Sequence, residues 1–269
     1  MKKPEIILLL YFLTLCSSFV VAQRDIINEN NTRIVTLNTP GKEVIIKSGN
    51  DKKALLNIEG EKGKDIAVKL FVRHLGVNDS LSFYINGRDE PMEWQDSTEY
   101  IFKTLNGTAY AKIEFINPEM DTSSLTVSYY QLENGEFQSF EDEMAYLNTV
   151  IINRKGKYIN HPLSVLFQDF NTYDIDINAF QREIDYNEAL LYKWIDFFPK
   201  TTDEILFHRI KRAYLWRIEF NQYYSVEELD SIKELYWDVE DNSNEWNIDY
   251  KKLLSGKVLK KIELNELKR

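Results

Sequence analysis

The sequence contains a single cysteine, Cys16, among its 269 residues. Cys16 falls inside an N-terminal apolar segment, so the rest of the chain can form neither a disulfide nor a thiolate metal site. An iron–sulfur cluster and a cysteine nucleophile are excluded for the same reason. A chain of this length can bury a large apolar core, and we expect packing alone to hold the fold together.

Histidine is nearly as scarce, and familiar catalytic motifs are missing. The three histidines, His74, His161 and His208, lie far apart and show no metal-binding spacing. The sequence has no Gly-x-Ser-x-Gly elbow, no phosphate-binding glycine loop and no dinucleotide fingerprint. We therefore predict no cofactor. The net charge of −10 makes nucleic acid an unsuitable partner.

Residues 1–22 have the pattern of a secretory signal peptide. Lys2 and Lys3 precede an apolar run over residues 6–15, and Ala22 offers a cleavage site before Gln23. We expect export to a periplasm, an outer surface or the extracellular space, with residues 23–32 forming a flexible leader. Two alternatives stay open, namely a lipid anchor on Cys16 and an uncleaved anchor over residues 6–22.

Residues 65–87 are the clearest structural signal in the chain. Apolar residues alternate with others over residues 66–72 and again over residues 81–85, which is the period of a β-strand with one buried face. We predict two neighbouring antiparallel strands that need a second sheet to cover them. About eight strands of this kind over residues 33–132 predict an all-β sandwich or jelly roll.

This half of the chain resembles CUB domains and similar bacterial extracellular sandwiches. The matching residues are Val68–Val72, Asp79, Leu81, Phe83, Tyr84, Gly87, Ile113–Phe115 and Leu125–Tyr129. The resemblance implies an adhesive or accessory module rather than an enzyme. Some CUB domains bind calcium through acidic residues, of which Asp79 carries over, whereas Asn86 stands near Gly87. The cysteines of that family are absent, and one extra residue separates Tyr84 from Gly87.

Residues 139–269 change in character and predict an α+β domain. Helix starts are expected at Ser139, Pro162 and Ser225, each followed by apolar residues at helical spacing. Residues 175–180 and 189–198 are typical of strands. Residues 205–220 fit the periods of both a helix and a strand, so their structure is left open.

The segment around Trp94 is the best candidate binding site in the sequence. An aromatic ring can stack on the apolar face of a sugar while carboxylates accept hydrogen bonds from its hydroxyl groups. The same carboxylates could also serve a glycosidase, and Trp94 could instead fold back and plug its own loop. The predicted binding residues are Trp94, Asp89, Glu93 and Asp96.

Oxygen-rich stretches offer weak metal candidates only, and we predict no metal site. Residues 238–249 place acidic or amide oxygens at alternate positions, as calcium loops do. However, Ser243 stands where such loops need glycine, and Asp249 where they need glutamate. A solvated acidic loop is the simpler interpretation. The candidates are Asp79, Asp238, Glu240 and Asn242.

These observations favour an exported, non-catalytic protein that binds another protein or a glycan. A secreted hydrolase with paired carboxylates and a structural subunit of an envelope complex are the alternatives. Asp-Ser/Thr-apolar triplets, such as Asp79-Ser80-Leu81, resemble O-glycosylation acceptors of Bacteroidota envelopes, and the composition is rich in Lys, Asn and Ile. We therefore expect a bacterial source of that kind.

Overall fold

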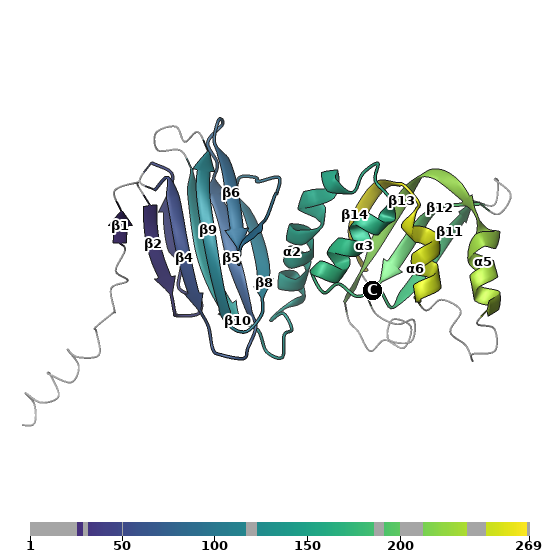
Figure 1. Cartoon of the computed structure of the whole chain (residues 1–269), viewed down its shortest axis with the longest axis horizontal. Coiled ribbons are helices and arrows are strands. Elements are labelled where there is room, and N and C mark those ends of the chain that lie inside the picture. Colours follow the sequence, from purple (N-terminus) through teal and green to yellow (C-terminus); the bar gives the residue numbers. More distant parts are fainter. Residues whose placement is uncertain are drawn as a thin grey trace, which may run out of the picture. The chain divides into compact units, whose positions relative to one another are not determined.

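The fold is described from a computed structural model, which is rich in β-sheet and has a few helices (Figure 1). The structure describes residues 26–28, 32–49, 51–116, 123–185, 191–199, 212–235 and 246–267. The chain divides into two compact units, residues 1–90 with 104–134 and residues 91–103 with 135–269. Each unit is described by itself. The predicted signal peptide lies outside the described residues.

Two sheets build the N-terminal half of the chain. One has the strand order β1-β2-β4-β9-β6-β7, and the other has the order β3-β10-β5-β8. The strands are β1 (Ile26–Asn28), β2 (Thr32–Leu37), β3 (Val44–Lys47), β4 (Lys53–Glu59), β5 (Ile66–His74), β6 (Ser80–Ile85), β7 (Arg88–Asp89), β8 (Thr98–Thr104), β9 (Thr108–Ile116) and β10 (Ser124–Gln131). Figure 1 shows these strands stacked in layers.

Alternation along the strands decides which side chains form the core. Val68 and Leu70 of β5, Phe83 of β6 and Ile113 of β9 are all fully buried. Their intervening neighbours Lys69, Tyr84 and Lys112 are only partly buried. The prediction that these apolar residues face a core is therefore confirmed, and β-sandwich character follows from two sheets that each bury one face.

The predicted pairing of residues 66–72 with residues 81–85 is wrong. β5 pairs with β10, whereas β6 pairs with β9 in the other sheet. The link between them is held at the start of β10, because the Gly76 N–H donates to Ser123 Oγ and Ser123 Oγ donates to Asp79 Oδ2. The chain thus crosses between the sheets. An alternating pattern identifies the buried face but not the neighbouring strand.

The last two strands of this half occupy the middle of the two sheets. β9 lies between β4 and β6, and β10 lies between β3 and β5. β2 and β4 pair in parallel, since β3 between them in sequence belongs to the other sheet. The pairs β1–β2, β3–β10, β5–β10, β4–β9, β6–β7 and β6–β9 are antiparallel.

The C-terminal unit contains one antiparallel sheet, with the order β11-β12-β13-β14, and several helices. Helices α3 and α6 lie on one face of this sheet (Figure 1). Phe170 of α3 packs on Trp216 of β13, and Tyr250 of α6 packs on Phe180 of β11. The elements are α2 (Phe140–Val150), η1 (Ile152–Lys157), α3 (Leu163–Thr172), β11 (Ala179–Asp185), β12 (Leu191–Phe198), β13 (Ala213–Ser225), α5 (Val226–Leu235), α6 (Ile248–Ser255) and β14 (Leu259–Leu267).

The three predicted helix starts are confirmed. Ser139 Oγ accepts a hydrogen bond from the Asp142 N–H, which satisfies an amide at the start of α2. Pro162 is the N-cap of α3, and α5 begins at Val226, directly after Ser225. Helix α6, capped by Asn247, and strand β14 were not predicted.

The strand predictions in this half were less accurate. Residues 175–178 precede the strand, which begins at Ala179 and continues to Asp185. Asp174 adopts a left-handed φ of 55°, and the Ile175 N–H donates to the carbonyl of Phe170, so these residues close α3 instead. In the segment left open, residues from Ala213 onward form β13, while residues 205–211 lie outside the described residues.

Candidate functional site

The solvent-facing side of the six-stranded sheet carries an ordered row of side chains. Strand register places Leu55 opposite Lys112, Lys112 opposite Tyr84, and Tyr84 opposite Asp89. The row therefore crosses β4, β9, β6 and β7. Opposed side chains on one face of an antiparallel pair lie about 5 Å apart, close enough for a single ligand to contact several of them.

Tyr110 is the most exposed aromatic ring on this side of the sheet, with 47% of its surface accessible. It stands opposite Asn57 and diagonally from Tyr84, and the Tyr110 N–H donates to Asn86 Oδ1 at 2.9 Å. Large rings left this open at the middle of a sheet are uncommon away from binding surfaces. We call the surface the tyrosine face, and it comprises Leu55, Asn57, Tyr84, Asp89, Tyr110, Lys112 and Glu114.

Lys112 fixes the geometry at the centre of the tyrosine face. Its Nζ lies 4.2 Å from the centroid of the Tyr84 ring and 2.7 Å from Glu114 Oε2. The bond to Glu114 raises the pKa of Lys112, and the same bond lowers the pKa of Glu114. Lys53 adds a second contact to Glu114 Oε1 at 3.4 Å. Both groups therefore remain charged and oriented over a wide pH range.

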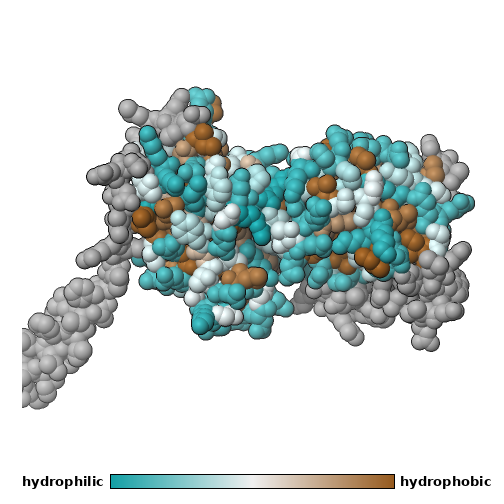
Figure 2. Space-filling view, viewed as in Figure 1, coloured by the Kyte–Doolittle hydropathy of each residue, from teal (hydrophilic) through white to brown (hydrophobic). Residues whose placement is uncertain are grey.

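The tyrosine face offers an exposed ring beside hydrogen-bonding groups on a rigid sheet. Tyr110 supplies an apolar surface, while Asn57 and Asp89 are exposed and can bond to hydroxyl groups. On the side of the molecule drawn in Figure 2, brown hydrophobic residues occur in small separate groups amid hydrophilic surface. On the tyrosine face itself, an exposed ring beside exposed hydrogen-bonding side chains suits a polar ligand with local apolar patches.

The sequence-predicted binding residues are divided between the two units. Asp89 lies on the tyrosine face, whereas Glu93, Trp94 and Asp96 belong to the segment grouped with the C-terminal unit. The half-buried ring of Trp94 packs edge-on against the fully buried Tyr100, with centroids 4.6 Å apart. Glu93 and Asp96 are exposed. Sugar binding by Trp94 stays a prediction.

Sequence analysis did not assign a function to Tyr84 and Tyr110, although a signal was present. Both tyrosines occupy the polar phase of an amphipathic strand, where small or charged side chains are usual. An aromatic residue in that phase points to the solvent-facing side of the sheet, whereas aromatic residues in the apolar phase point into the core. A tyrosine in the polar phase of a strand therefore indicates an exposed ring, although a tryptophan among carboxylates is the easier pattern to see in the sequence.

The metal candidates do not assemble a site within the described residues. Asp79 is buried and its Oδ2 accepts a 2.5 Å hydrogen bond from Ser123 Oγ. Where the structure is described, it shows no group of three or more His, Cys, Asp or Glu residues that could hold an ion. Asp238, Glu240 and Asn242 lie outside the described residues, and Asp249 is in the first turn of α6.

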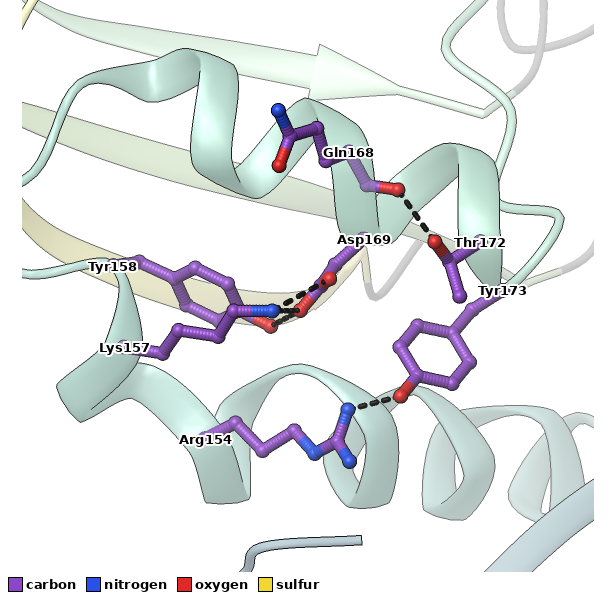
Figure 3. A network of polar contacts seen from close by, with 7 residues as sticks. All are labelled: Arg154, Lys157, Tyr158, Gln168, Asp169, Thr172 and Tyr173. Atoms are coloured by element: carbon purple, nitrogen blue, oxygen red, sulfur yellow. Dashed lines mark hydrogen bonds and ion pairs between the residues drawn. The ribbon is translucent and has the colours of Figure 1, made fainter. Parts of the chain in front are cut away.

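A second polar network, in the C-terminal unit, is centred on the carboxylate of Asp169, which is bonded to Lys157 and Tyr158 (Figure 3). Both carboxylate oxygens of buried Asp169 accept bonds from Lys157 Nζ at 2.8 Å, and Tyr158 OH donates to Oδ2 at 2.7 Å. Burial, together with the bond to Asp169, raises the pKa of Tyr158. A tyrosine held protonated in this way is a poor base. The network therefore joins the end of η1 to α3.

A second cluster of hydrogen bonds, around Arg154 and Tyr173, lies next to the Asp169 network. The Arg154 guanidinium donates to Tyr173 OH, and Tyr146 OH donates to the carbonyl oxygen of Tyr173 at 3.1 Å. Figure 3 shows the Arg154–Tyr173 contact beside the Asp169 carboxylate and its two donors. Asp169 lies in α3 with its carboxylate buried.

Comparisons with known proteins identify no family. No family model matches the sequence, and no curated protein matches it either. Among solved structures, a similar chain is the pre-peptidase C-terminal domain of a collagenase from Bacillus anthracis, with 11% identity and a TM-score of 0.26. The match covers 36% of this chain and 93% of that chain. Within the described residues, no helix has the length and apolar character needed to cross a bilayer.

Proposed function

We propose that this chain is an exported, non-catalytic binding protein that recognises a glycan through the tyrosine face. The single observation that supports the proposal is the position of Tyr110, an open ring at the middle of a sheet and directly opposite Asn57. Sugars present apolar C–H faces bordered by hydroxyl groups, and this pairing of a ring with hydrogen-bonding side chains matches both.

Two further observations agree with a binding role. Residues 1–22 have the pattern of an export signal, and the resemblance to CUB domains implies an adhesive module. The tyrosine face is also built on strands rather than loops, so its side chains are held in place before a ligand arrives.

A glycan array followed by calorimetry tests the proposal. The purified chain should bind at least one glycan on the array, and Tyr110→Ala should weaken that binding about tenfold, or about 1.4 kcal/mol. Tyr223→Ala is a matched control, because Tyr223 is 40% exposed but lies on β13 in the other unit. It should leave affinity within about twofold.

Two results would contradict the proposal. One is the absence of binding to any glycan by the folded chain, and the other is equal loss of affinity in Tyr110→Ala and Tyr223→Ala. Circular dichroism of each variant separates a lost contact from a lost fold. Release of reducing sugar from a bound glycan would instead favour the secreted hydrolase, and glycan-independent capture of an envelope protein would favour the structural subunit.

A further inference from the structure

On the solvent-facing side of the six-stranded sheet, negatively charged side chains outnumber positively charged ones. Within the described strands, this side carries two cations and three anions. The cations are Lys53 and Lys112, and the anions are Glu59, Asp89 and Glu114. The sheet face thus repeats, on a small scale, the acidic balance of the whole chain. An anionic ligand would meet net repulsion there.

Both cations are already engaged by one carboxylate. Lys112 Nζ contacts Glu114 Oε2 at 2.7 Å, and Lys53 Nζ contacts Glu114 Oε1 at 3.4 Å. Lys112 is also held over the Tyr84 ring. A sulfate or uronate group that approached either lysine would compete with Glu114 for it and would also lie close to that carboxylate, which repels anions.

The remaining carboxylates are available to a ligand. Glu59 and Asp89 are exposed, and neither forms an ion pair with another described residue. Ionised carboxylates are strong acceptors for hydroxyl groups and strongly disfavour nearby anions. Asn57, opposite Tyr110, adds a neutral donor and acceptor.

We infer that the tyrosine face selects uncharged, hydroxyl-rich glycans and rejects sulfated or uronic ones. This inference rests on the proposed function and specifies the ligand class of the same surface. Recognition depends on ring stacking and hydrogen bonds rather than on ion pairing. Affinity for the neutral ligand should therefore depend only weakly on ionic strength.

Matched glycan pairs with the same backbone test the inference. The probes are dextran with dextran sulfate, cellulose oligosaccharides with their C6-oxidised uronic forms, and any neutral glycan found on the array with its sulfated form. The neutral member should bind in a Tyr110-dependent manner, with affinity changing less than about twofold between 50 and 500 mM NaCl. The sulfated member should bind at least about tenfold more weakly.

Two variants that each remove one negative charge test whether Glu114 is responsible for rejecting sulfated glycans. Glu114→Gln releases both lysines and should increase binding of the sulfated member severalfold, in a salt-sensitive and Tyr110-dependent way. Glu263→Gln makes the same change in net charge on β14 and should not produce this gain. Preferential, Tyr110-dependent binding of a sulfated or uronic member by the unmodified chain would overturn the inference while leaving glycan binding intact. Failure of every member to bind would remove the proposed function, and the inference with it.

Discussion

The amide of Gly60 donates a 2.5 Å hydrogen bond to the carbonyl oxygen of Gly107, and neither glycine has space for a side chain. A Cβ on Gly60 would meet Ile66 Cγ2 at 2.6 Å and the Gly107 oxygen at 2.9 Å. A Cβ on Gly107 would collide with the carbonyl group of Glu61, and the residue has a φ of +72°. The end of β4 and the turn before β9 therefore fit together only through glycine.

Gly107→Ala should destabilise the protein by about 3 kcal/mol or more, because backbone atoms cannot move aside cheaply. Gly87→Ala is the matched control, since Gly87 has a similar φ of +77° but nothing within 4 Å of its Cβ position. It should cost about 1 kcal/mol, which is the backbone strain alone. Urea unfolding measures both values, and equal losses would show that the close contact contributes nothing.

Glu114→Gln should lower stability only between about pH 5 and pH 10. The pKa of Glu114 is lowered in the folded protein, so its contribution is present above the ordinary carboxyl pKa and disappears as the pH falls through the lowered value. The pKa of Lys112 is raised, so its contribution disappears as the pH rises through the raised value. The loss should be below about 1 kcal/mol, since the pair is partly exposed.

Thermal melts of the wild type and Glu114→Gln across pH 3–11 measure this window. The difference in Tm should be largest near neutral pH, vanish toward pH 3, and shrink in 1 M NaCl. Glu136→Gln removes an exposed carboxylate that forms no ion pair with another described residue, and it should show no such window. A constant difference at every pH would mean that side-chain packing, not charge, is responsible.

The two donors to Asp169 should differ in their importance for stability. Tyr158 is 1% exposed, whereas 48% of the Lys157 side chain is accessible. A double-mutant cycle of Asp169→Ala with Tyr158→Phe should give a coupling free energy of about 1–2 kcal/mol. The cycle with Lys157→Gln should give less than about 1 kcal/mol, because water competes for the lysine. A larger coupling for Lys157 would contradict this order.

Trp94→Ala should destabilise the protein by about 1–2 kcal/mol through loss of its contact with Tyr100. The Tyr100 hydroxyl also bonds to its own loop, accepting from the Gln95 N–H and donating to the carbonyl of Glu93. We expect glycan affinity to remain within about twofold of wild type. A tenfold loss of affinity with unchanged stability would instead support Trp94 as the binding residue, as the sequence predicts.

Local signals predicted the burial of strands and the start of helices with good accuracy. Ser139 caps α2 because its hydroxyl lies within reach of the Asp142 amide, which is a property of a few adjacent residues. The fully buried Val68 and Phe83 were evident from alternation alone. Such features need no knowledge of distant parts of the chain.

Relationships between distant residues could not be predicted in the same way. β5 and β6 follow each other in the chain but lie in different sheets. The link between them is bonded to Ser123, which lies more than forty residues beyond Gly76. The tyrosine face depends on the register of four strands, β4, β9, β6 and β7, of which only β6 and β7 are consecutive in the chain. Helix α6 is eight residues long, too short to give a clear periodic signal.

The position of β9 and β10 at the middle of their sheets sets the order in which the sandwich can form. Strands up to β8 must wait for residues 108–131 before their central neighbours exist, so a growing chain cannot complete either sheet early. Closing such long loops is slow. For a chain that we expect to cross a membrane unfolded, late closure has an advantage, because the polypeptide can still be threaded across until residues 108–131 have been synthesised.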